Sequence, residues 1–162
     1  LGGTNAGRVL GKKAGVAVTV LDALKAFFVV WIVYLIRPSS AVVSGCMCAI
    51  GHCFPIFANF RGGKAVATTM GYLLGVSIFI THTPFQLFVI PALIFFGVLY
   101  LRKMVSLASI CAVVSAAIIS CFVTNDFYTA LSIMMLAVFV IYRHKENIER
   151  IKTNTEKKIT WM

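Results

Sequence analysis

Residues 14–36 read "AGVAVTVLDALKAFFVVWIVYLI", and this stretch decides the fold class. A helix needs about 20 predominantly apolar residues to cross the hydrocarbon core of a bilayer, and the stretch is long enough. Backbone N–H and C=O groups inside lipid must be hydrogen-bonded within the segment, which a helix achieves. The sequence therefore predicts a membrane-spanning helix at residues 14–36.

The composition extends this prediction to the whole chain. Of its 162 residues, 60% are hydrophobic and only 12% are charged, with a mean hydropathy of +0.93. An ordinary soluble domain has about a quarter of its residues charged. We expect an all-α polytopic integral membrane helix bundle, with residues 1–162 as a single transmembrane domain and residues 143–162 as a cytoplasmic C-terminal tail.

Apolar segments and polar connections alternate along the chain. Six apolar segments are expected to be helical: Ala14–Ile36, Ala41–Phe57, Ala65–Ile80, Phe85–Leu101, Leu107–Val123 and Phe127–Tyr142. The first is comfortably long for a span and the others are at the short end. Gly71 and Gly75 have the spacing of small residues that lets two helices approach closely.

The basic residues are distributed unevenly between the two sets of loops. The formal net charge is +10, and 13 of the 15 Lys and Arg residues fall in alternate connections or the C-terminal tail. Such a bias places that side of the membrane in the cytoplasm. The same charge suits an anionic substrate or lipid. Nucleic-acid binding is not expected, because the charge lies in short loops rather than on one soluble face.

Two glycine-rich clusters lie on this basic side. The first, residues 2–15, reads "GGTNAGRVLGKKAG" and is expected to form a loop whose backbone N–H groups turn toward an anion. Thr4 and Asn5 add side-chain donors, and Arg8 can grip phosphate oxygens in a fork. The alternative is an ordinary positive loop that flanks the start of a helix.

The second cluster, residues 51–71, reads "GHCFPIFANFRGGKAVATTMG". Pro55 favours the end of one helix, and His52 lies about one turn before it. Gly62 and Gly63 form a turn, and Lys64 sits where the next helix begins, which is a favourable place for an anion. The alternative is an interfacial lysine that reaches toward the headgroups.

Two shorter clusters complete this side of the membrane. Ser106 and Ser109 in "LRKMVSLAS" lie three apart, although membrane helices often carry serines that bond their own backbone. His144 and Asn147 in "VIYRHKENIERIKTNTE" are also three apart and are expected to share a helix face. A solvated tail explains the charges of this last segment but not its His–Asn pair.

Ionisable groups also occur within the first span. Asp22 and Lys25 lie three apart, and we expect a mutual ion pair facing the interior of the bundle, since isolated charges at this depth are costly. The cysteines near His52 match no common zinc spacing, so no metal site is expected.

Taken together, the motifs resemble a known family. "GGTNAGRVLGKKAG", "LDALKA", "GHCFPIFANFRGGKAVAT", "VSLASI" and "RHKENIERI" are similar to segments of the bacterial acyl-phosphate-dependent glycerol-3-phosphate acyltransferases, the PlsY family. The resemblance implies seven spanning helices in the bacterial plasma membrane with an active site facing the cytoplasm. A helix and a Gly-Ser-x-Asn element would then precede Leu1, so we expect an N-terminally truncated member. Ala65 stands where a third glycine usually follows the lysine.

The resemblance also implies a reaction and its participants. A fatty acyl group would move from acyl phosphate to the sn-1 hydroxyl of glycerol 3-phosphate, giving lysophosphatidic acid and phosphate. No cofactor is expected, because the phosphate already activates the acyl group. The resemblance assigns Thr4, Asn5, Arg8, Gly62 and Gly63 to phosphate binding; Lys64, Ser106, His144 and Asn147 to catalysis; and Asp22, Lys25, His52 and Pro55 to structural support near the site.

Two alternatives remain open at the level of the sequence. One is a small transporter of a phosphorylated solute, and the other is a non-catalytic membrane subunit that binds anionic lipid. The general base is also open between His144 and the leaving phosphate, and the sequence gives neither the acyl-chain preference nor the oligomeric state.

Overall fold

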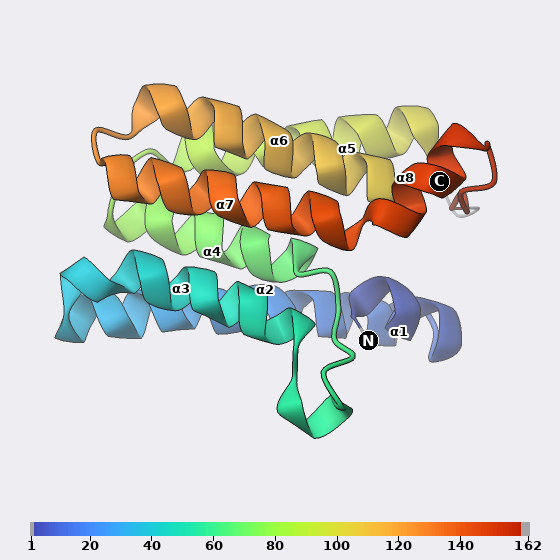
Figure 1. The fold of residues 1–162 in the computed structure, drawn as a ribbon, viewed down its shortest axis with the longest axis horizontal. Helices are drawn as coiled ribbons and strands as arrows, with labels where there is room; N and C mark the ends of the chain where they lie inside the picture. Colours follow the sequence, from blue (N-terminus) through green and yellow to red (C-terminus); the bar gives the residue numbers. More distant parts are fainter. Residues whose placement is uncertain (1, 160–162) are drawn as a thin grey trace. The chain divides into compact units, whose positions relative to one another are not determined.

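The computed structural model describes residues 2–159, which form helices joined by short connections, with no strand among them (Figure 1). The chain divides into two compact units, Leu1–His82 and Thr83–Met162. The single transmembrane domain expected for residues 1–162 therefore stays a prediction.

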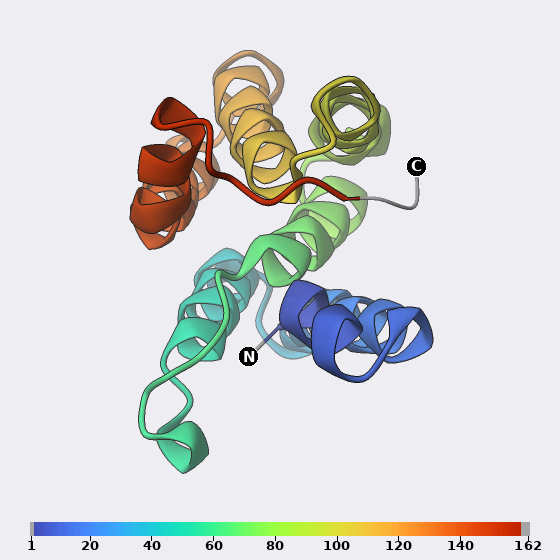
Figure 2. The same ribbon diagram turned by 90° about the vertical axis from the view of Figure 1, so that its right-hand side faces the viewer.

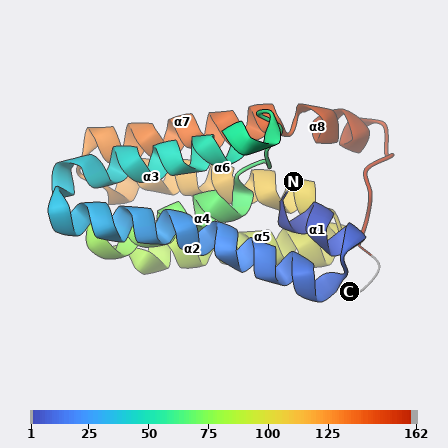
Figure 3. The same ribbon diagram turned by 90° about the horizontal axis from the view of Figure 1, so that it is seen from below.

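The first unit is built around one long helix. Its elements are α1 (Gly3–Val9), α2 (Lys12–Ile36), α3 (Pro38–Cys53), the single 3-10 turn η1 (Ile56–Ala58) and α4 (Val66–Phe79). Arg37 alone joins α2 to α3, and the two helices run back along one another (Figures 1 and 3). Pro38 occupies the first position of α3, where its missing N–H has no helical partner to lose.

Glycines allow the helices of this unit to pack closely. A Cβ atom on Gly71 of α4 would collide with the carbonyl oxygen of Ala23 on α2. A Cβ atom on Gly75 would stand 2.9 Å from Cβ of Val30, further along the same two helices. The small-residue spacing at Gly71 and Gly75 predicts a close helix contact, and the packing of α4 on α2 confirms it.

The second unit contains three long helices and a bent extension. Its elements are η2 (Phe85–Val89), α5 (Ile90–Arg102), α6 (Val105–Val123), α7 (Phe127–Arg143) and α8 (Lys145–Lys152). The π-helical turn η2 runs directly into α5 just before Pro91, which has no N–H to continue the regular hydrogen-bond ladder. Asp126 caps α7, because its carboxylate accepts bonds from the backbone N–H groups of Tyr128 and Thr129.

Helix α6 is the centre of the second unit and packs against both α5 and α7. Its residues Ala108, Ala112 and Ala116 are buried at intervals of one turn. These small side chains let the neighbouring helices approach, in the way expected of helix pairs in lipid.

The six predicted apolar segments each coincide with a helix of the structure. Among the described residues, four helices are long and apolar enough to cross a membrane, or up to five if the bent pair α7 and α8 forms one span. Helix α4 is apolar but shorter, at 14 residues. The all-helical prediction is confirmed, whereas the number of spans stays a prediction.

The prediction of a loop at residues 2–15 is wrong for most of that segment. Gly3–Val9 forms α1, which packs on the beginning of α2. A Cβ atom on Gly15 of α2 would stand 2.6 Å from Cα of Gly7 of α1, so the glycines act as a flat contact surface. Tertiary packing therefore outweighs the low helix propensity of glycine. Within this stretch, Gly2 and Gly11, with φ of 120° and 89°, use the conformational freedom that the sequence suggested.

Candidate active site

The glycine pair at 62–63 closes a loop at the end of α3. Helix α3 ends at Cys53, and the chain leaves the helix at residues 54–61 before it returns. The N–H of Gly62 then donates to the carbonyl of Cys53 at 3.1 Å, and the N–H of Gly63 donates to that of His52 at 3.3 Å. A Cβ atom on Gly62 would collide with the carbonyl oxygen of His52, which explains the glycine at this position.

Lys64 follows this closure immediately. Ala65 takes a left-handed conformation, with a φ of 57°, and α4 begins at Val66. The predicted helix end near Pro55 and the predicted helix start just after Lys64 are both confirmed. Lys64 thus lies beside backbone N–H groups at the start of a helix, where an anion is favoured.

The first glycine-rich cluster lies beside the second. A Cβ atom on Gly2 would stand 3.8 Å from Cα of Gly63, so the N-terminal end of α1 approaches the closed loop. Thr4, Asn5 and Arg8 are exposed on α1. The first unit therefore brings together two cationic, glycine-rich segments that are far apart in sequence.

Three ionisable groups meet between α2 and α3. The ammonium of Lys25 lies 2.6 Å from Oδ1 of Asp22, which confirms the predicted ion pair. The same ammonium lies 2.6 Å from Nδ1 of His52, while Oδ1 of Asp22 is 3.3 Å from that nitrogen. The sequence predicted that His52 lies near the helix break, but it did not predict the contact of His52 with the ion pair.

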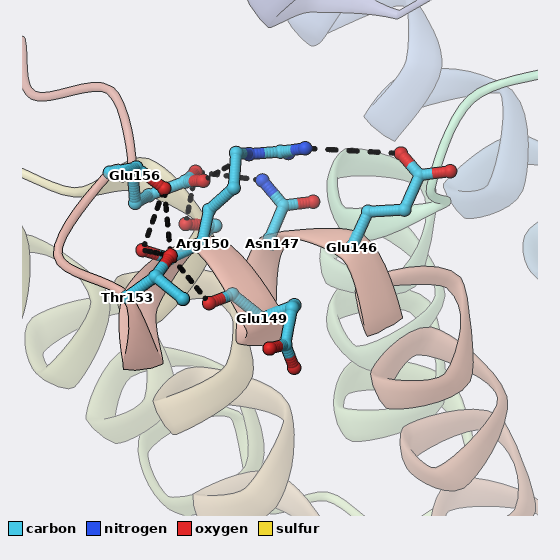
Figure 4. A network of polar contacts seen from close by, with 8 residues as sticks. Glu146, Asn147, Glu149, Arg150, Thr153 and Glu156 are labelled. Carbon is cyan, nitrogen blue, oxygen red and sulfur yellow. Dashed lines mark hydrogen bonds and ion pairs between the residues drawn. The ribbon is translucent and has the colours of Figure 1, made fainter.

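A second polar cluster occupies one end of the second unit. Its centre is the carboxylate of Glu156, whose side chain is only 6% exposed. Oε1 accepts a bond from Oγ of Ser106 at 2.7 Å. It also accepts from Nδ2 of Asn147 at 2.7 Å, while Oε2 accepts from Nε of Arg150 at 2.8 Å, and Figure 4 shows these last two bonds. The same carboxylate thus accepts hydrogen bonds from two predicted site residues, Ser106 and Asn147.

The segment that carries Glu156 folds back over α6. After α8 the chain crosses the N-terminal end of α6, as Figure 2 shows, and the N–H of Ile159 donates to the carbonyl of Lys103 at 2.8 Å. Burial alone would raise the pKa of Glu156. The hydrogen bonds from Ser106, Arg150 and Asn147, together with the charge of Arg150, outweigh burial and hold that pKa below its usual range.

His144 lies at a break between two helices. The axes of α7 and α8 differ in direction by 59°, and His144 is the residue between them. His144 is the N-cap of α8, and its carbonyl accepts from the N–H of Ile148 at 2.9 Å, so the bend precedes the turn that carries His144 and Asn147, whose side chains are both buried. Nδ1 of His144 lies 2.7 Å from the carbonyl oxygen of Val140. A carbonyl can only accept, so Nδ1 carries a hydrogen and donates it to Val140.

Ser106 and Ser109, which share one segment of the sequence, make different hydrogen bonds in the structure. Oγ of Ser109 bonds the backbone carbonyl of Val105, one turn earlier in its own helix, which is the ordinary role of serine in a membrane helix. Ser106 instead bonds across the unit to Glu156.

Glu156 is the residue that sequence reasoning missed. The contact of Arg150 with Glu146 is long, at 3.9 Å, and its close partner is Glu156, at 2.8 Å. An isolated glutamate in a Thr- and Lys-rich tail gives little signal, because the bond depends on the chain folding back.

Comparisons with known proteins agree with this arrangement of motifs. The profile of the family described as glycerol-3-phosphate acyltransferase matches residues 1–154. A glycerol-3-phosphate acyltransferase of Bacillus velezensis is 44% identical over 162 residues, covering 99% of this chain and 80% of that protein. A protein of the same name from Bacillus subtilis is 42% identical over 163 residues, covering all of this chain and 80% of its own length.

A solved structure is also similar. The crystal structure of PlsY, described as an integral membrane glycerol 3-phosphate acyltransferase in its glycerol 3-phosphate form, matches with a TM-score of 0.89. The two chains are 33% identical, and the match covers 98% of this chain and 78% of the other. The lysophosphatidic acid form matches with a TM-score of 0.88.

These findings define an all-helical integral membrane protein of the acyltransferase class. The chain belongs to the glycerol-3-phosphate acyltransferase family. The alternative of a transporter for a phosphorylated solute is not supported by this membership.

Proposed function

We propose that this protein transfers a fatty acyl group from acyl phosphate to the sn-1 hydroxyl of glycerol 3-phosphate. The products are lysophosphatidic acid and inorganic phosphate. The observation that carries the proposal is the meeting of two cationic, glycine-rich segments in a member of this family, at Gly2 and Gly63. Both substrates carry phosphate, and such segments supply the N–H groups and positive charge that phosphate requires.

The first unit contains the residues that we assign to phosphate binding. Gly62, Gly63 and Lys64 supply one phosphate contact next to the start of α4. The helix α1 supplies the other through Thr4, Asn5 and Arg8, where the guanidinium can form two parallel bonds to phosphate oxygens. Positive charge at these positions also stabilises the phosphate that leaves the donor.

The second unit contains the residues that we assign to the chemical step. The sn-1 oxygen of glycerol 3-phosphate attacks the carbonyl carbon of acyl phosphate, a C–O ester bond forms, and the bond from that carbon to the phosphate oxygen breaks. Nε2 of His144 accepts the hydroxyl proton, which is supported by the Nδ1–H bond that His144 makes to Val140. Ser106 and Asn147 lie in the same unit, where their bonds to Glu156 hold them in place for contact with the substrates.

The location of the reaction follows from the charge distribution. The basic connections and tail are expected in the cytoplasm of a bacterial cell, and every proposed site residue lies in or beside them. A site at this face of the plasma membrane meets both a water-soluble acceptor and a donor with a long acyl chain.

A turnover assay with the purified chain in lipid tests the proposal. Wild-type protein supplied with acyl phosphate and glycerol 3-phosphate is expected to release phosphate and lysophosphatidic acid in equal amounts. His144→Ala should reduce kcat by about 100-fold or more, since general-base catalysis contributes about that factor. Lys145→Ala, which changes the exposed neighbour of His144, is the matched control and should retain activity.

Two results would contradict the proposal. Absence of acyl transfer by folded wild-type protein would refute the activity. Near-normal rates in both His144→Ala and Lys64→Ala would refute the assignment of the site.

A further inference from the structure

The ring of His52 connects an ion pair that the proposed reaction does not use to the glycine pair that is proposed to contact phosphate. One edge of the ring faces the Asp22–Lys25 ion pair through Nδ1. The opposite edge faces the glycine pair, because a Cβ atom on Gly63 would collide with Nε2 and stand 3.1 Å from both Cδ2 and Cε1. A single side chain thus spans the distance from α2 to the segment that precedes Lys64.

The geometry of the ion pair fixes the orientation of the ring. An ammonium group can only donate, so at 2.6 Å Lys25 donates to Nδ1 of His52. The longer distance of 3.3 Å from Asp22 to Nδ1 fits a carboxylate that neutralises Lys25 rather than one that accepts from the ring. The ring hydrogen then lies on Nε2 and points toward the glycine pair.

The backbone of His52 supports the same segment. Its carbonyl accepts from the N–H of Gly63 at 3.3 Å, and the carbonyl of the next residue, Cys53, accepts from Gly62 at 3.1 Å. The side chain of His52 is only 11% exposed, and that of Asp22 is 14% exposed. The glycine pair is therefore held from two sides by one residue that is itself locked to α2.

We propose that His52, oriented by Lys25 and Asp22, is a positioning residue that fixes the shape of the phosphate loop, defined as Gly62, Gly63 and Lys64. The kinetic effect expected from this assignment depends on the proposed function, because the phosphate loop binds phosphate in that reaction. The ion pair inside α2 then has a defined role, because it holds the imidazole against the loop. Ionisable pairs at membrane depth are costly and are usually functional, which agrees with this role.

The kinetic test compares three substitutions at one position. His52→Ala is expected to raise KM for glycerol 3-phosphate by about tenfold, the scale of one lost polar contact, with kcat changed less than about threefold. His52→Gln should recover most of the affinity, because its amide can reach the place of Nε2. His52→Asn, whose amide stays near the place of Nδ1, should remain defective. Asp22→Asn should act in the same direction as His52→Ala.

A second measurement does not depend on activity. Arg61 is exposed and directly precedes the phosphate loop, so trypsin cleavage after Arg61 reports whether the loop is closed. The cleavage rate, followed by mass spectrometry, is expected to rise several-fold in His52→Ala and to return toward the wild-type rate in His52→Gln. Leu21→Met and Met47→Leu, exposed neighbours on α2 and α3, serve as controls and should change neither readout.

The outcomes separate this assignment from the proposed reaction. If wild-type protein transfers no acyl group, the proposed function fails, and cleavage after Arg61 still tests the role of His52. Unchanged cleavage and unchanged KM in His52→Ala would overturn the positioning role. Equal defects in His52→Gln and His52→Asn would also overturn it, because simple loss of packing does not distinguish the two ends of the ring.

Discussion

Oγ of Ser106 lies 2.7 Å from Oε1 of Glu156, a carboxylate that stands 50 positions further along the chain. The same oxygen accepts from Asn147, so one carboxylate ties the start of α6 to α8. This junction holds two of the proposed site residues in place.

Substituting Glu156 tests this junction. Glu156→Ala leaves the donors of Ser106, Asn147 and Arg150 without their common acceptor. We expect a loss of about 2–3 kcal/mol in the free energy of unfolding, by comparison with other buried hydrogen bonds to charged groups. Thermal unfolding in detergent measures the loss, and Glu149→Ala on the exposed side of α8 is the matched control. Equal unfolding temperatures in the two variants would contradict the role of Glu156.

The same carboxylate predicts a dependence on pH. The pKa of Glu156 is held below its ordinary value of 4.5, so its ionised form stabilises the fold. This contribution is complete above about pH 4.5 and is lost as the pH falls through the lowered pKa. The protection factor for hydrogen exchange at Ile159, whose N–H is bonded to Lys103, should therefore fall as the pH is lowered through the pKa of Glu156. Glu156→Gln should remove this acid-dependent step.

Lys64 is expected to act through its charge. Lys64→Ala should lower kcat/KM for glycerol 3-phosphate by about 100-fold, because a charge-assisted phosphate contact of about 2–3 kcal/mol is removed. Lys64→Arg should keep part of the activity, since it retains the charge but changes the donor geometry. Steady-state kinetics with Arg37→Ala as the control measure both effects. If Lys64→Arg and Lys64→Ala are equally impaired, charge is not the determining property.

Ser106 and Ser109 should differ in their effects. Ser106→Ala is expected to lower both stability and activity, because it removes a bond to Glu156. Ser109→Ala removes only a bond to its own helix and should change stability by less than about 0.5 kcal/mol. Parallel measurement of unfolding temperature and kcat checks the pair, and a larger defect in Ser109→Ala would reverse the assignment.

A glycine comparison tests the packing of the first unit. Gly71→Ala places a methyl group against the carbonyl of Ala23 and should cost about 1–3 kcal/mol. Gly97→Ala, within α5, meets no atom within 4 Å and should be neutral or slightly stabilising, because alanine has the higher helix propensity. Unfolding temperatures in the same detergent decide between these expectations, and similar values for the two variants would refute the close contact.

The sequence was a good guide to helices and to helix ends. Apolar length located all six apolar helices, and Pro55 with the glycine pair located the break after α3. The sequence was a poor guide to α1. Its glycines predicted a loop, whereas the segment forms a helix that packs on α2. The sequence did not predict the sharp bend between α7 and α8, which lies just before the turn that carries His144 and Asn147.

By itself, the sequence determined the membrane environment, the all-helical fold class and the family, because these depend on apolar length and on short motifs. It also determined which residue types are available for phosphate chemistry. Only the tertiary structure decided which of them meet: Gly2 with Gly63, His52 with the Asp22–Lys25 pair, and Ser106 with Glu156. Contacts of this kind depend on how helices cross and where the chain folds back, and no periodic pattern in the sequence records either.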